Sequence, residues 1–203
     1  MLQPDIAKRA NGLATQRKLL AAAGAIFAQT VCRGAAKNIA VEADISQGSL
    51  YFHFGHKDEI AKAVIAAQQK RVDEVLARVR AWEETALEQL FLLMERLADL
   101  IASDELVQAG IRLATQQDAE RSFDVGGPYA AWERVMAATL RDGIADGSMA
   151  PDMDHRSAAE LINEIFVGAE NIAGITDKWA SLPHRIATTR ATVRLLLTTS
   201  LPQ

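Results

Sequence analysis

The residues best suited to binding or catalytic chemistry lie between Gly34 and Ile60. Small polar residues, aromatic residues and one cation follow each other closely there, and the candidates are Ser46, Gln47, Gly48, Ser49, Tyr51, Phe52, His53 and Lys57. Their hydroxyl, amide, imidazole and ammonium groups can donate hydrogen bonds to phosphate oxygens and to base edges. These residue types at this spacing favour contact with nucleic acid.

Two short helices must position these groups. The spacing of apolar residues predicts helices at about 36–43 and 48–53, which pack across a tight turn with Ser46 as the cap of the second. A helix of two turns contributes little to a core, yet this one presents small polar residues outward, as insertion into the major groove requires. The alternative is a packed helical hairpin with an aromatic cluster at residues 51–54. The apolar residues behind both interpretations are Ile39, Ala40, Ala43, Ile45 and Leu50.

Charge is distributed unevenly along the 203 residues, whose formal net charge is −4. Residues 1–40 hold six basic residues and one acidic residue, which gives +5. Residues 1–60 carry +2, so residues 61–203 carry −6. A basic N-terminal end on an acidic remainder indicates two regions, of which the first faces polyanions.

The composition is that of an ordinary globular chain, with 49% hydrophobic and 24% charged residues. No apolar run approaches the roughly 20 residues of a membrane span, and the N-terminus lacks a signal pattern. With a single cysteine, Cys32, the chain has no internal disulfide. We therefore expect a cytoplasmic protein that does not enter a membrane.

Helical periodicity recurs along the chain while strand signals are nearly absent, which predicts an all-α protein. The sequence gives only weak signals for a metal site or for catalysis. The four histidines have no second ligand at helical spacing, and no nucleophile elbow, glycine-rich phosphate loop or Cys–His pair occurs. We expect no enzyme, no metal site and no cofactor. The remaining expected helices cover residues 15–29, 57–81, 85–102, 104–117, 129–146, 155–174 and 183–200.

The run IAVEADISQGSLYFHFGHKDEI, residues 39–60, resembles the helix-turn-helix signature of the TetR family of transcriptional regulators. With the preceding helix, the resemblance covers about residues 13–65. It implies a three-helix DNA-binding domain over residues 1–56 and a helical ligand-binding and dimerisation domain over residues 57–203. It also implies that Ser46 caps the recognition helix and that the other candidates above lie at or beside the DNA contact surface.

Three departures from the family pattern surround this motif. Thr30 and Asp44 stand where the family usually has glycine, and Gly34-Ala35 replaces the usual Ser or Thr cap of the second helix. A lost cap costs about 1 kcal/mol of local stability. The acid in the turn is expected to weaken or redirect phosphate contacts.

The rest of the chain resembles, more loosely, the γ-butyrolactone receptor branch of the family. The similar segments are residues 57–68, 110–115, 128–132 and 166–170. In that branch the tryptophan matching Trp132 lines the pocket for the signalling lactone, and the glutamine matching Gln68 lies on the long linking helix. An indole offers a flat apolar wall and an amide can donate to a lactone carbonyl. Core packing of Trp132 and solvation of Gln68 are the alternatives.

Asn163, Glu164 and Val167 complete the candidate ligand set. The first two stand where the receptors tend to have small or apolar residues, so a ligand that meets them is more polar than a simple alkyl butyrolactone, or is absent. The predicted function is a homodimeric repressor that binds a palindromic operator in double-stranded DNA and is released by a small-molecule inducer, γ-butyrolactone-like. The alternative is a TetR-type regulator of a drug or acyl molecule, or a pseudo-receptor without lactone response.

Overall fold

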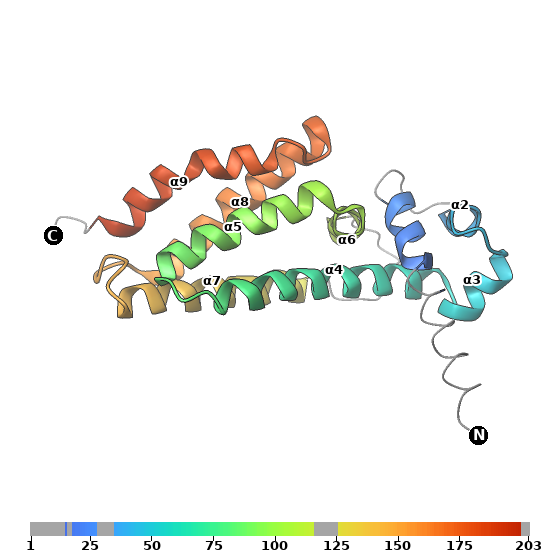
Figure 1. Ribbon diagram of the computed structural model, residues 1–203, viewed down its shortest axis with the longest axis horizontal. Coiled ribbons are helices and arrows are strands. Elements are labelled where there is room, and N and C mark those ends of the chain that lie inside the picture. The colour runs from blue at the N-terminus through green and yellow to red at the C-terminus, as the bar shows by residue number, and fades with distance from the viewer. Residues whose placement is uncertain (1–14, 16–17, 28–34, 116–125, 200–203) are drawn as a thin grey trace, which may run out of the picture. The chain divides into compact units, whose positions relative to one another are not determined.

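The computed structural model describes residue 15 and residues 18–27, 35–115 and 126–199. Within these ranges every regular element is a helix, which confirms the all-α prediction (Figure 1). Helical residues 18–27 precede α2, and most observed bounds fall within three residues of the expected ones. None of the described helices is both long and apolar enough to cross a membrane. The labelled helices are α2 (Ala35–Glu42), α3 (Gln47–Phe54), α4 (Lys57–Arg80), α5 (Ala86–Ser103), α6 (Glu105–Thr115), α7 (Gly126–Ala145), α8 (His155–Asp177) and α9 (Leu182–Thr198).

The chain divides into two compact units. The first holds residues 1–71 and 104–123, and the second holds residues 72–103 and 124–203. Helix α4 continues from the first unit into the second, and α6 belongs to the first although it follows α5 in the chain. These units do not follow a single cut after residue 56, so the place where the functional domains divide stays a prediction.

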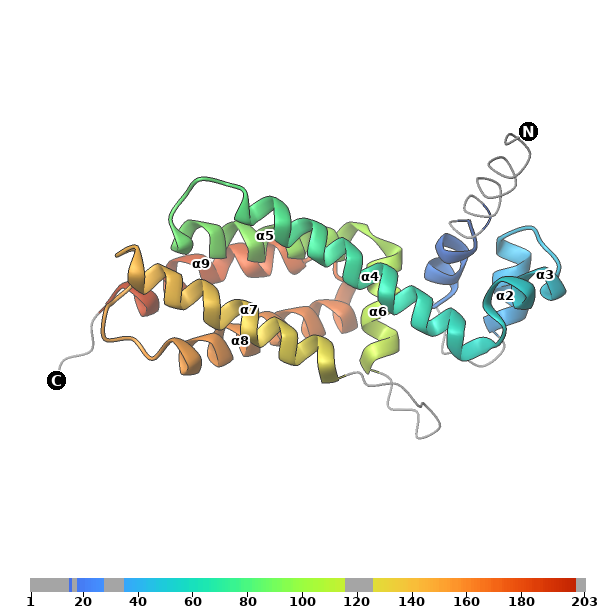
Figure 2. The ribbon, with the colours of Figure 1, turned by 90° about the horizontal axis from the view of Figure 1, so that it is seen from below.

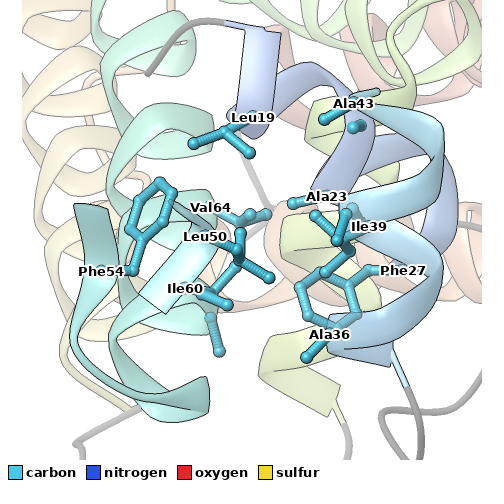
Figure 3. Packing of buried hydrophobic residues seen from close by; sticks show 14 of the residues in the cluster. Leu19, Ala23, Phe27, Ala36, Ile39, Ala43, Leu50, Phe54, Ile60 and Val64 are labelled. Atoms are coloured by element: carbon cyan, nitrogen blue, oxygen red, sulfur yellow. The ribbon is translucent and has the colours of Figure 1, made fainter. Parts of the chain in front are cut away.

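The first unit has one hydrophobic core, to which residues 18–27, α2, α3, α4 and α6 all contribute. Figure 3 shows the labelled side chains, among them Leu19, Ile39, Leu50 and Val64, gathered between these helices. Helix α6 adds three buried residues from its apolar face, Leu106, Ala109 and Leu113.

Helix α6 is attached closely to its neighbours in the first unit. Asp104 precedes it, and the Oδ1 atom of Asp104 accepts hydrogen bonds from the backbone N–H groups of Leu106 at 2.9 Å and Val107 at 3.2 Å. The other oxygen of this carboxylate pairs with Arg71 of α4. A Cβ on Gly24 would lie 3.1 Å from the Cα of Leu106, so the first helix and α6 approach each other at a position with no side chain.

In the second unit, α5, α7, α8 and α9 pack in a closed ring. Helix α5 contacts α7 and α9, and α8 contacts the same two helices (Figures 1 and 2). The interior of this ring is apolar. Its largest fully buried side chains are Leu90, Leu93, Met94, Met136, Leu140 and Ile162.

A cluster of charged side chains links α5 to α9. Arg190 donates to Glu95 and to Glu88, both at 2.6 Å, and Arg194 pairs with Glu88 as well. Both guanidinium groups lie over the Phe91 ring, at 4.6 and 4.9 Å from its centroid. The hydrogen bond from Arg194 and the charges of both arginines hold the pKa of Glu88 below its ordinary value.

Candidate nucleic-acid interface and ligand site

Helix α3 is held firmly at both ends. The side chain of Ser46 accepts a hydrogen bond from the N–H of Ser49 at 3.1 Å, so Ser46 caps the helix as the sequence predicts. Gly55 ends the helix at φ 73°, in the left-handed region that favours glycine, and its N–H donates to the carbonyl of Tyr51. Leu50 and Phe54 are buried in the core of the first unit. These contacts fix the inner face of α3 and leave its outer face available.

The outer face of α3 carries most of the predicted DNA contacts. Gln47, Gly48, Tyr51 and Phe52 are exposed, and the Phe52 side chain is 86% exposed. Ser49 and His53 are half-buried. The rings of Phe52 and His53 meet edge to face with centroids 5.7 Å apart.

Lys57 is the first residue of α4, and its side chain lies outside the described part of the structure. The candidates Ser46 to His53 are therefore brought together on one short helix and its cap. Their contact with DNA remains a prediction.

The turn before α3 explains one departure from the family pattern. Asp44 has φ 53°, a left-handed conformation that glycine adopts without steric cost. The N–H groups of Asp44 and Ile45 donate to the carbonyls of Val41 and Ala40, at 3.0 and 2.9 Å. The turn is thus formed in full, with an exposed carboxylate where the family usually has no side chain. The positions of Thr30, Cys32 and Gly34 lie outside the described residues.

Val41 is a surface residue that the sequence reasoning missed. It lies on α2, one turn before α3, and is 72% exposed although it is apolar. Lys37 and Asn38 are exposed on the same helix. The sequence does indicate this exposed face, because these three positions alternate with the apolar residues that are buried on α2.

Gln68 lies half-buried on α4 within the first unit. It packs against α6, where a Cβ on Gly110 would lie 2.6 Å from the Cβ of Gln68. This contact explains the burial of Gln68, and its role toward a ligand stays a prediction.

The other candidate ligand residues belong to the second unit. Trp132 is half-buried on α7, and Asn163 and Val167 are half-buried on α8. The Oδ1 atom of Asn163 is buried and has no hydrogen-bond partner among the described residues. Glu164, by contrast, is exposed, and nothing in its placement supports a role in a pocket.

Glu170 is the carboxylate that the sequence reasoning did not single out as a ligand residue. It is half-buried on α8, two turns after Asn163, and burial raises its pKa to about 7. The sequence places a glutamate in a helix, but its desolvation depends on what the other helices cover.

Comparison with known proteins supports the same fold. The A-factor receptor protein of Streptomyces griseus is 26% identical over 185 residues, which is 90% of this chain and 63% of that protein. The match therefore spans less than two thirds of the receptor. A solved structure described as the molecular basis for control of antibiotic production by a bacterial hormone has a TM-score of 0.82 at 27% identity, covering 92% of this chain and 98% of that one.

A γ-butyrolactone receptor, described as ArpA-like, shares the fold with a TM-score of 0.68 at 21% identity, covering 88% of this chain and 98% of that one. Residues 19–64 match the family described as bacterial regulatory proteins, tetR family. Residues 84–198, more than half of the chain, match the family described as tetracyclin repressor-like, C-terminal domain. The chain therefore belongs to the TetR family of bacterial regulatory proteins.

Proposed function

We propose that this protein is a cytoplasmic, ligand-responsive transcriptional repressor that binds a palindromic operator as a homodimer and is released by a small signalling molecule. The observation that carries the proposal is helix α3, capped by Ser46 and presenting Gln47, Tyr51 and Phe52 outward. A helix of this size fits the major groove, where amide and hydroxyl groups reach base edges and phosphates.

Dimerisation is supported by exposed apolar side chains on the second unit. Leu161, Ile172 and Ile175 are exposed on α8, and Leu195 and Leu196 are exposed on α9. On α8 these residues are eleven and three positions apart, close to whole turns of a helix, which places them along one side of it. Apolar stripes of this kind on neighbouring helices are typical of an interface between copies. Two recognition helices would then read half-sites about 34 Å apart, one turn of DNA.

The inducer is proposed to be γ-butyrolactone-like and to lie against Trp132, Asn163 and Val167. The similarity to a protein named as a receptor for A-factor supports a signalling ligand. The half-buried indole of Trp132 supplies an apolar surface. The Asn163 Oδ1 atom, which has no hydrogen-bond partner in the described part of the chain, supplies a polar one. This polar surface also favours a second candidate, a regulator whose ligand belongs to another and more polar class.

Fluorescence anisotropy with DNA from the protein's own upstream region tests the proposal. We expect salt-dependent binding of a dimer to one palindromic site, and release when 2-octyl-γ-butyrolactone is added. Trp132→Ala should bind the same site with unchanged affinity and fail to respond to the lactone. Absence of site-specific binding would overturn the repressor assignment, and binding without release by the lactone would overturn the ligand class.

A further inference from the structure

Helix α8 presents two different flanks on either side of its buried stripe. One flank is apolar and largely exposed, and it carries Leu161, Ile165, Ile172 and Ile175. The other, here called the polar flank, consists of the half-buried residues Asn163, Val167, Glu170 and Gly174. The spacing of these four residues, by four and three, places them on one side of the helix. Only the apolar flank resembles a surface that another copy of the chain would cover.

The polar flank holds a buried acceptor without a donor. The Oδ1 atom of Asn163 is inaccessible to solvent and makes no hydrogen bond within the described ranges. Native proteins pair nearly all such atoms, because desolvation without a hydrogen bond opposes folding. An acceptor left in this state therefore indicates a group that a ligand can satisfy.

Glu170 provides a second acceptor on the same flank. Burial alone raises the pKa of its carboxyl to about 7, and no charge or hydrogen bond from the described residues offsets this. Glu170 lies seven positions after Asn163, which corresponds to about 10 Å along the helix, with Val167 between them. Along the polar flank, the acceptor of Asn163 is therefore followed by the apolar side chain of Val167 and then by the acceptor of Glu170.

An indole closes the C-terminal end of the polar flank. A Cβ on Gly174 would lie 2.9 Å from the Cε2 atom of Trp179, a buried residue in the turn after α8. The ring therefore fills the space beside Gly174. A molecule on this flank would extend from Trp179 toward Asn163.

We propose that the polar flank of α8 is the specificity-determining part of the ligand site, and that it binds an elongated apolar molecule with a hydrogen-bond donor near each end. The apolar segment lies over Val167, and the donors, hydroxyl or ammonium groups, reach Asn163 and Glu170. This inference rests on the proposed function and adds to its small signalling molecule two hydrogen-bond donors, which a simple alkyl lactone lacks.

Titration calorimetry with four matched compounds tests the inference on the full-length protein. The compounds are 1,8-octanediol, 8-amino-1-octanol, 1-octanol and 1,8-dimethoxyoctane, which share one chain length and differ in their donors. We expect the wild type to bind the diol or the amino alcohol at least ten-fold more tightly than the dimethoxy compound, with 1-octanol between them. The affinities of 1,8-octanediol and 8-amino-1-octanol are then compared. Tighter binding of the diol indicates a ligand with two hydroxyl groups, and tighter binding of the amino alcohol indicates a ligand with an ammonium group. Equal affinity for the diol, the amino alcohol and the ether, or no binding of any of them, would overturn the inference.

Variants separate ligand recognition from a structural role. Asn163→Leu and Glu170→Leu should each reduce the preference for the two-donor compound at least five-fold. Each should also raise the thermal midpoint of the ligand-free protein, because it removes an unpaired buried group. Asn171→Leu and Glu160→Leu make the same changes at exposed positions of α8 and should leave the preference unchanged. Lowered midpoints together with an unchanged preference would show that the polar flank is structural.

Operator binding on the same samples keeps the two proposals apart. If the diol preference appears while no site in the upstream DNA is bound, the repressor assignment fails and the polar flank survives. If the operator is bound and released by the lactone while the preference is missing, only the inference about the polar flank fails.

Discussion

Gly110 of α6 faces Gln68 of α4 so closely that a Cβ at position 110 would lie 2.6 Å from the Cβ of Gln68 and 2.8 Å from its Cγ. The atoms near that position belong to the stem of the side chain, which cannot move aside without moving the helix. Together with the Asp104–Arg71 pair, this contact sets the spacing between α6 and α4.

Gly110→Ala should therefore destabilise the protein. Alanine gains up to about 1 kcal/mol of helix propensity, but the displaced helix costs roughly 1 to 3 kcal/mol. Denaturant unfolding should show a lower midpoint. Gly48→Ala is the control, since among the described residues a Cβ there meets only the Ser46 Oγ at 3.8 Å, and the variant should be neutral or slightly stabilising. A more stable Gly110→Ala protein would contradict the close packing.

Substitutions at Asp44 can separate the effect of its left-handed backbone on stability from the effect of its charge on DNA binding. Asp44→Gly should raise the free energy of unfolding by about 0.5 kcal/mol, because glycine adopts φ 53° without strain while it loosens the unfolded chain. Asp44→Asn should leave stability nearly unchanged. Both variants remove a negative charge beside α3, so both should bind operator DNA more tightly at low salt. Thermal unfolding and anisotropy titrations check the two effects independently.

Two further substitutions test the contacts of the recognition helix. Tyr51→Phe removes one hydroxyl donor and should weaken operator binding roughly five-fold, with an unchanged dependence on salt. Lys57→Ala removes a cation and should weaken binding while it reduces the slope of log K against log salt by about 0.9. Anisotropy titrations over a salt series distinguish the two. Unchanged affinity of both variants would remove these residues from the contact surface.

The burial of Glu170 predicts a dependence of stability on pH. Its pKa rises from an ordinary value of 4.5 to about 7 on folding. Between these two pH values the folded state therefore binds more protons than the unfolded state. Stability is therefore lost as the pH rises through this window. Glu170→Gln should match the wild type below pH 4.5 and exceed it above pH 7, by on the order of 2 kcal/mol.

Denaturant midpoints of both proteins at a series of pH values measure this difference. Glu160→Gln, at an exposed position of the same helix, should show no such trend. A constant difference between Glu170→Gln and the wild type across the series would mean that the carboxyl is solvated.

The extent of the helices could be predicted from the sequence, because apolar periodicity and capping residues are local. Ser46 as a cap and the tight turn at Asp44 were of this kind. The partner of a helix is not local. The spacing of Leu106, Ala109 and Leu113 indicates that α6 has a buried face, but not that this face completes the core of the first unit. The same limit applies to Glu170, because the burial that raises its pKa is a property of the folded chain and not of the local sequence.

The insertion of α6 into the first core has a consequence for how such a protein can be divided. A contiguous fragment that ends with α4 would keep the recognition helix and lose Leu106, Ala109 and Leu113, which leaves part of its core uncovered. A chimaera that transfers the DNA-binding half to another regulator must carry residues 104–115 as well. Recombination at a single point between α4 and α6 would separate this helix from its core.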